Sequence, residues 1–200
     1  MTAAIRDLYS ETPLRLAITL PGIPQVEKSP SQIDAERSLQ SFQVNALGPM
    51  LLMKHLSSFL PTKSSPQFQG GERNLGQDNS QWCLPTSHAI YAVMAARVGS
   101  VSDNTSGGWY SYRASKASVF QLAKTFDLYL QSRSRERAIA VAMHPGTVQT
   151  DFTKDYWYGR SMLQPGESAA LLLKLPCSIG TGVNEGRGRC WDWNGEEVMP

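Results

Sequence analysis

The chain has 200 residues, of which 41% are hydrophobic, and a formal net charge of +2 at pH 7. This length and apolar content suffice for one globular domain with a substantial core, so we expect residues 1–200 to form a single domain. The small net charge argues against nucleic acids and membrane surfaces as partners, and no apolar run approaches the length of about 20 residues that spans a bilayer. Three widely separated cysteines fit neither a zinc site nor a disulfide framework, so we expect no metal and a cytoplasmic location (Cys83, Cys177 and Cys190).

The first half of the chain predicts a strand, a long helix and a loop. Residues 14–20 (LRLAITL) form a short apolar run that stops at Pro21, which is typical of a buried strand. Residues 33–59 carry apolar side chains at helical spacing, so we expect one long helix with a broad apolar face. Residues 60–87 are rich in Gly, Ser, Gln and Pro and predict a flexible surface loop.

The second half alternates strands with helices. Apolar runs at residues 89–94 and 137–143 predict buried strands, and residues 188–193 predict a short final strand. Helices are expected at residues 109–132 and 164–175, the latter with Pro165 and Glu167 in its first turn. This alternation predicts an α/β fold in which helices cover both faces of a parallel sheet.

Tyr112 and Lys116 form the pair with the clearest chemical meaning. They stand four residues apart on a predicted helix, so both side chains emerge on one face. An ammonium beside a phenol favours the phenolate and lowers a pKa that is about 10 when unperturbed. A tyrosine of this kind can exchange a proton with a carbonyl or alcohol oxygen. The same spacing also occurs in ordinary surface pairs, so the pair alone does not define an active site.

Three longer motifs give the pair its context. The stretches YSYRASKA, HPGTVQTD and FQVNALGP resemble the active-site helix, the cofactor loop and the preceding long helix of short-chain dehydrogenases/reductases. The stretch RVGSVSDNTSGGWYSYRASKA resembles the C-factor-like, carbonyl-reductase-like branch of that family. The resemblance runs from about residue 8 to the end of the chain. It implies a Rossmann-type three-layer sandwich that uses NADP or NAD to interconvert small-molecule carbonyls and alcohols.

The resemblance assigns a role to each matched residue. Tyr112 would be the catalytic acid/base, and Lys116 would hold the nicotinamide ribose and lower the pKa of the tyrosine. The turn after the third strand run would bind the cofactor, with the Val148 backbone at the carboxamide and the Thr150 hydroxyl at a phosphate. The cofactor-binding positions implied in this turn are Pro145, Gly146, Val148 and Thr150. His144, just before it, is expected to be a packing residue.

Asn45 matches the helix asparagine that supports a water molecule in the family's proton relay. The sequence offers an independent reason for this match. Pro49 lies four residues after Asn45 and has no amide hydrogen for the Asn45 carbonyl to accept. The freed carbonyl would be available to a water, although a plain proline kink is the alternative interpretation.

The chain departs from the family pattern at two places. Ala96 occupies the position of the catalytic serine, and Ser100 is the candidate that could replace it. The loss of one such donor can lower a rate by about 10²–10³-fold. The sequence also lacks the glycine-rich phosphate loop that opens family members, so we expect only strands four to seven of an incomplete Rossmann fold in a truncated chain. Cofactor binding should then be weak or absent.

Three interpretations stay open at this point. The chain is a working NAD(P)-dependent oxidoreductase, or an incomplete product of such a gene with impaired activity. In the third interpretation it is a non-catalytic protein that forms a homo-oligomer or pairs with a full-length relative, through a sheet edge left open by the missing first strand or through its long helices.

Overall fold

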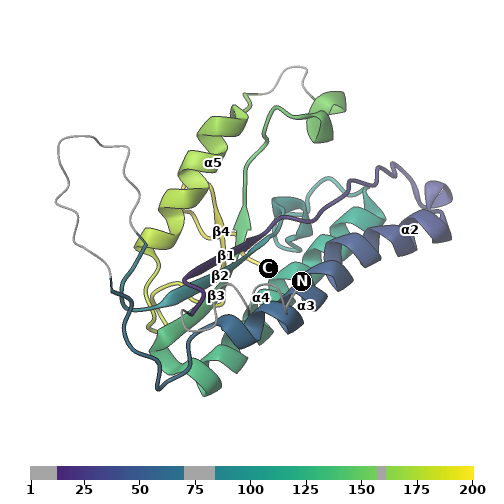
Figure 1. Cartoon of the computed structure of the whole chain (residues 1–200). Coiled ribbons are helices and arrows are strands. Elements are labelled where there is room, and N and C mark those ends of the chain that lie inside the picture. Colours follow the sequence, from purple (N-terminus) through teal and green to yellow (C-terminus); the bar gives the residue numbers. More distant parts are fainter. Residues whose placement is uncertain (1–12, 70–83, 157–160) are drawn as a thin grey trace.

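A single parallel sheet organises the structure, a computed structural model that describes residues 13–69, 84–156 and 161–200. The four strands of the described residues lie in the order β1-β2-β3-β4, so strands adjacent in the sequence are adjacent in the sheet (Figure 1). In the register, Ile90 pairs with both Leu16 and Ile139. The predicted α/β fold with a parallel sheet is confirmed. The strands are β1 (Leu16–Thr19), β2 (Ala89–Met94), β3 (Ala138–His144) and β4 (Cys190–Asp192).

Helices cover both faces of this sheet (Figure 1). They are α2 (Ala35–Phe42), α3 (Gly48–Leu56), α4 (Tyr110–Ser134) and α5 (Pro165–Lys174). Short 3-10 segments link these elements at Pro30–Gln32, Ser57–Phe59, Arg97–Gly99, Arg135–Arg137, Asp151–Tyr156 and Leu175–Ser178.

The strand side chains alternate between two buried cores. Tyr91 and Ala140 belong to the core on the side of α3 and α4, together with Val119 of α4. Their strand neighbours Ile90 and Val141 belong to the other core, on the side of α5. The nearly continuous apolar sequences of β2 and β3 are therefore explained, because a parallel sheet with two covered faces buries side chains on both of them.

The long helix predicted for residues 33–59 is interrupted. A π-helical segment, Gln43–Leu47, separates α2 from α3, and in it the Gly48 amide donates to the carbonyl of Gln43. Pro49 explains this change because it offers no amide hydrogen to the turn before it. The structure thus places a local departure from α-geometry at Asn45, where the sequence predicted a disturbed hydrogen bond.

Helix α4 begins after an unusual run of left-handed residues. Gly107, Gly108 and Trp109 have φ values of 64°, 67° and 55°. A glycine adopts this conformation without the steric cost that a β-carbon adds. This run ends directly before Tyr110, where α4 starts, two residues before Tyr112.

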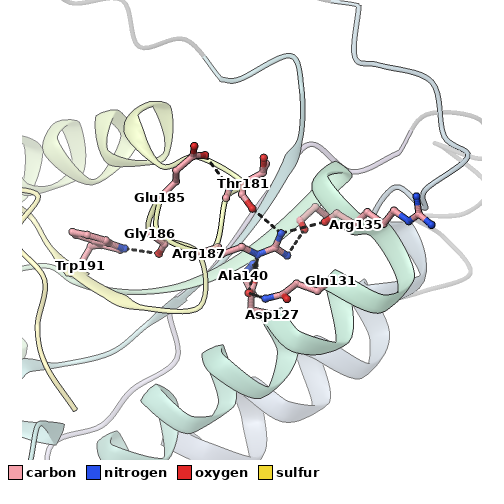
Figure 2. A network of polar contacts seen from close by, with 11 residues as sticks. Asp127, Gln131, Arg135, Ala140, Thr181, Glu185, Gly186, Arg187 and Trp191 are labelled. Atoms are coloured by element: carbon pink, nitrogen blue, oxygen red, sulfur yellow. Dashed lines mark hydrogen bonds and ion pairs between the residues drawn. The ribbon is translucent and has the colours of Figure 1, made fainter.

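A buried ion pair joins α4 to the sheet at its far end (Figure 2). The guanidinium of Arg187, which precedes β4, donates through Nε to Asp127 Oδ2 at 2.9 Å. The other oxygen of Asp127 accepts the Ala140 amide of β3 at 3.0 Å, and Gln131 donates to Oδ2 at 2.9 Å. Arg187 also donates to three backbone carbonyls (Arg135, Ala138 and Thr181). The pair is almost fully buried, with 4% of the arginine side chain and none of the aspartate side chain exposed.

The loop predicted for residues 60–87 lies partly outside the described residues, as does Cys83. Its described parts, residues 60–69 and 84–87, contain no helix or strand. Across the part of the chain that the structure describes, no helix is both long enough and apolar enough to cross a membrane.

Candidate active site

A cavity of about 840 Å³ opens at the carboxyl ends of the strands, beside the first turns of α4 and α5. In open α/β sheets this edge is where ligands bind. The cavity is lined by the predicted pair Tyr112 and Lys116 and by the turn that follows β3 (Pro145, Gly146, Thr147, Val148 and Thr150). Ala96, at the expected serine position, also lines it. Asn45 and Ser100 do not belong to its lining.

Lys116 is a buried cation at the base of the site, with 3% of its surface exposed. Its ammonium donates to the carbonyl of Met94, at the end of β2, at 2.9 Å and to that of Pro21 at 3.4 Å. Gly22 lies against it so closely that a β-carbon there would be 3.2 Å from Nζ. Burial lowers the pKa of Lys116 to about 8, because desolvation disfavours the charged form.

Tyr112 is 5% exposed and lies between two aromatic rings. Its ring centroid is 5.8 Å from that of Trp109 and 6.2 Å from that of Phe152, both at tilted angles. Burial raises the pKa of Tyr112 above its ordinary value of 10.0. The cause of this shift is the desolvation of the phenolate, and the lowering effect of Lys116 on the pKa of Tyr112 stays a prediction.

The side chain of Asn45 links the segment after β1 to α4 by hydrogen bonds. Its side chain accepts the Ile23 amide at 2.8 Å and donates to the Ile23 carbonyl at 3.0 Å. It also donates to Ser115 Oγ of α4 at 2.9 Å, and Ser115 donates to the carbonyl of Tyr112 at 2.9 Å. Asn45 thus ties the segment after β1 to the turn of α4 that carries Tyr112 and Lys116.

Ser100 is held away from the cavity. Its hydroxyl donates to the carbonyl of Met199 at 2.5 Å and accepts the Asp103 amide at 3.0 Å, and the residue is 1% exposed. The structure therefore does not bring Ser100 to the position that Ala96 occupies.

The turn after β3 has its backbone fixed on several sides. Ser168 of α5 donates to the Pro145 carbonyl at 2.8 Å, and Thr153 donates to the Val148 carbonyl at 2.5 Å. Gly146 has φ +80°, and a β-carbon on it would lie 2.6 Å from the Trp193 ring. Only glycine fits this position, because a side chain there would overlap the Trp193 ring that packs against the turn.

His144 also lines the cavity, which agrees with a location at the end of β3. Its Nδ1 atom is buried without a hydrogen-bond partner among the described residues. Burial lowers the pKa of His144 to about 4, with a smaller contribution from Arg97. His144 is therefore neutral at pH 7 and adds no charge to the site.

The sequence analysis missed two arginines of the lining, Arg97 and Arg113. Arg97 is shared between Asp103, at 2.9 Å, and Asp192 of β4, at 2.7 Å. Arg113 donates to backbone carbonyls of the loop before α4, including that of Val98 at 3.0 Å. Arg113 follows Tyr112 directly, but nothing in its sequence position reveals these long-range partners.

No protein family model matches the chain, but relatives share parts of its sequence. A 1-hydroxy-2-glutathionyl-2-methyl-3-butene dehydrogenase of Rhodococcus sp. (strain AD45) is 43% identical over 86 residues, which span 43% of this chain and 37% of that relative. C-signal of Myxococcus xanthus is 28% identical over 187 residues, which span 93% of this chain and 92% of C-signal.

Solved structures share the fold. An NADPH-bound carbonyl reductase from chicken fatty liver superposes with a TM-score of 0.78 at 21% identity, covering 100% of this chain and 71% of that chain. The structure thus has the Rossmann-type fold of carbonyl reductases. The resemblance of the chain to the short-chain dehydrogenase/reductase family is confirmed by fold and by sequence relatives together.

Proposed function

We propose that the chain is an NAD(P)-dependent oxidoreductase that interconverts small-molecule carbonyl compounds and alcohols. The observation that carries this proposal is the cavity that Tyr112, Lys116 and residues 145–148 and 150 line at the carboxyl ends of the strands. A phenol that can donate a proton, a buried cation and the half-buried turn after β3 meet there, and hydride-transfer chemistry on a carbonyl can use all three.

The residues present fit the nicotinamide end of such a cofactor. Lys116 donates two hydrogen bonds to backbone carbonyls, and its third N–H can donate a hydrogen bond to a ribose hydroxyl. The Val148 backbone would lie at the carboxamide and Thr150 at a phosphate, since both residues line the cavity. A glycine-rich loop at a strand-to-helix turn, as the adenosine end requires, is not found among the described residues, so we expect weak affinity.

The proposed reaction divides between the cofactor and the chain. When bound, the reduced nicotinamide supplies a hydride to the carbonyl carbon. Tyr112 gives its phenolic proton to the carbonyl oxygen, so that the product is the neutral alcohol. Because burial raises the pKa of Tyr112, the residue is a phenol at neutral pH and suits the reductive direction. Trp109 and Phe152 provide apolar walls around the reacting carbonyl.

The turnover experiment follows the consumption of NADPH at millimolar concentration with a panel of aldehydes, ketones and quinones. We expect slow, substrate-dependent consumption, because Ala96 offers no hydroxyl to the carbonyl oxygen. Ala96→Ser is the matched variant and should raise the rate by about 10²-fold if its hydroxyl reaches that oxygen. No consumption above the buffer rate by either folded protein would contradict the proposal.

One observation favours a second candidate, a non-catalytic protein that pairs with another copy or with a full-length relative. The helical segment from α2 to α3 exposes large apolar side chains, with exposed fractions of 59% for Leu39, 47% for Met50 and 46% for Leu51. A large exposed apolar surface can mark a site of protein–protein interaction. A stable dimer in sedimentation without any NADPH consumption would favour this function.

A further inference from the structure

Glu27 is a fully buried carboxylate that the catalytic proposal does not use. It lies in the segment between β1 and α2, 84 residues before its main partner in the sequence. No ion pair of the described residues includes it. A buried carboxylate without a cation requires strong hydrogen-bond donors, so its partners indicate its role.

Those partners lie in the first turn of α4. The Ser111 amide donates to Glu27 Oε2 at 3.0 Å, and the Ser111 hydroxyl donates to Oε1 at 2.5 Å. The backbone carbonyl of Glu27 accepts the Trp109 amide at 2.6 Å. Both ends of Glu27 therefore hold the residues that immediately precede Tyr112.

This arrangement replaces a helix cap that the local sequence does not provide. Trp109 is the N-cap residue of α4, has a left-handed conformation and makes no capping bond with its side chain. The first amides of a helix need acceptors, and a carboxylate at this end also interacts favourably with the helix dipole. Glu27 supplies the acceptor and the carboxylate from a distant segment, because its carboxylate accepts a hydrogen bond from the Ser111 amide, the second amide of the helix.

A row of hydroxyls extends the same anchor to α2. Ser38 Oγ lies 2.7 Å from Ser111 Oγ, and since the Ser111 proton goes to Glu27, Ser38 is the donor. One turn further along, Ser41 Oγ lies 3.2 Å from Ser115 Oγ. Tyr112 stands between these two contacts on α4, so its position depends on polar bonds before and after it.

We propose that Glu27 is a positioning residue that caps α4 from a distance and sets the location of the Tyr112 ring in the cavity. The inference rests on the proposed function for its catalytic consequence, but the anchoring itself is independent of turnover. A displacement of a reacting group by about 1 Å can lower a rate by about 10²-fold. The residue acts through Ser111 and the helix turn and does not touch the reacting atoms.

The first test uses fluorotyrosine-labelled protein and fluorine NMR, with the Tyr112 line assigned by its loss in Tyr112→Phe. Glu27→Ala should shift the Tyr112 line, because the ring changes its place relative to Trp109. Glu27→Gln keeps an acceptor oxygen for the Ser111 amide and should restore most of the native line position. The lines of Tyr91 and Tyr129 should stay unmoved, which separates a local displacement from a general loss of structure. An unmoved Tyr112 line in folded Glu27→Ala would overturn the inference.

The second test measures turnover and distinguishes the inference from the proposed function. Glu27→Ala should lower kcat by about 10²-fold with KM within about twofold of the native value, and Glu27→Gln should recover most of kcat. Ser111→Ala, which keeps the backbone bond to Glu27, should give a smaller decrease and serves if Glu27→Ala does not fold. Equal kcat in all variants would overturn the inference. A native protein without turnover would contradict the proposed function, and the fluorine spectra would still decide the anchoring.

Discussion

Replacing Tyr112 by phenylalanine should lower NADPH-dependent turnover by about 10²–10⁴-fold, which is the range that a positioned proton donor contributes. The ring and its contacts with Trp109 and Phe152 stay in place, because only the hydroxyl is removed. Cofactor binding should change little. The measurement is kcat/KM for the best carbonyl substrate of the panel, with the circular dichroism spectrum as the check on folding.

Tyr110→Phe is the matched control for this experiment. Tyr110 begins α4 two residues before Tyr112, but it is 39% exposed and does not line the cavity. Its loss of a hydroxyl should leave kcat/KM within about twofold, as expected for an exposed surface position. Turnover that persists in Tyr112→Phe, or that falls equally in both variants, would remove Tyr112 from its proposed role.

Arg187→Met should destabilise the fold by about 3–5 kcal/mol, the range measured when one partner of a buried ion pair is removed. The carboxylate of Asp127 would stay buried without a cation, and three carbonyls would lose their donor (Arg135, Ala138 and Thr181). The pair connects α4, β3 and the segment before β4 (Figure 2). Its loss should therefore lower the urea midpoint at which the whole sheet unfolds cooperatively.

Arg189→Met provides the comparison within the same segment. Its ion pair with Glu197, at 2.8 Å, is exposed to 36% and 28%. Exposed pairs contribute about 0–1 kcal/mol, so the urea midpoint of this variant should barely move. Both variants are measured by urea unfolding at pH 7 with a common slope. Equal midpoints for the two variants would show that burial does not strengthen the Asp127–Arg187 pair as proposed.

Much of the fold was predictable because the central strands are visible in the sequence as continuous apolar runs. The apolar runs 89–94 and 137–143 are continuous, which a sheet covered on both faces requires, and both became strands. The helix predicted for residues 33–59 was wrong in one respect, since it is divided at Gln43–Leu47. Pro49 carried the information for that change, but its sequence position was interpreted as a freed Asn45 carbonyl or a plain proline kink and not as a π-helical segment.

The site was predictable where neighbours in sequence are neighbours in space. Tyr112 and Lys116 share one helix face, and the turn after β3 follows its strand directly, so both signals are local. Glu27 could not be found in this way, because its partner lies 84 residues later. Ser100 shows the opposite error. Its proximity to Ala96 in sequence suggested a replacement, but a contact with Met199, 99 residues away, fixes its hydroxyl elsewhere.

The central claim is that the cavity binds a reduced nicotinamide against Lys116, and direct titration with reduced nicotinamide mononucleotide tests it. This probe carries only the nicotinamide, its ribose and one phosphate, so it tests the residues that line the cavity. Because the pKa of Lys116 is about 8, the side chain is mostly an ammonium at pH 7. It is mostly a neutral amine when the pH lies one and a half units above that pKa. Binding measured by calorimetry should therefore saturate at pH 7 and weaken by about tenfold as pH rises through 8, as expected for loss of a charged donor. In Lys116→Met the affinity should be low and independent of pH. No saturable binding at pH 7, or identical pH dependence in the two proteins, would contradict the account.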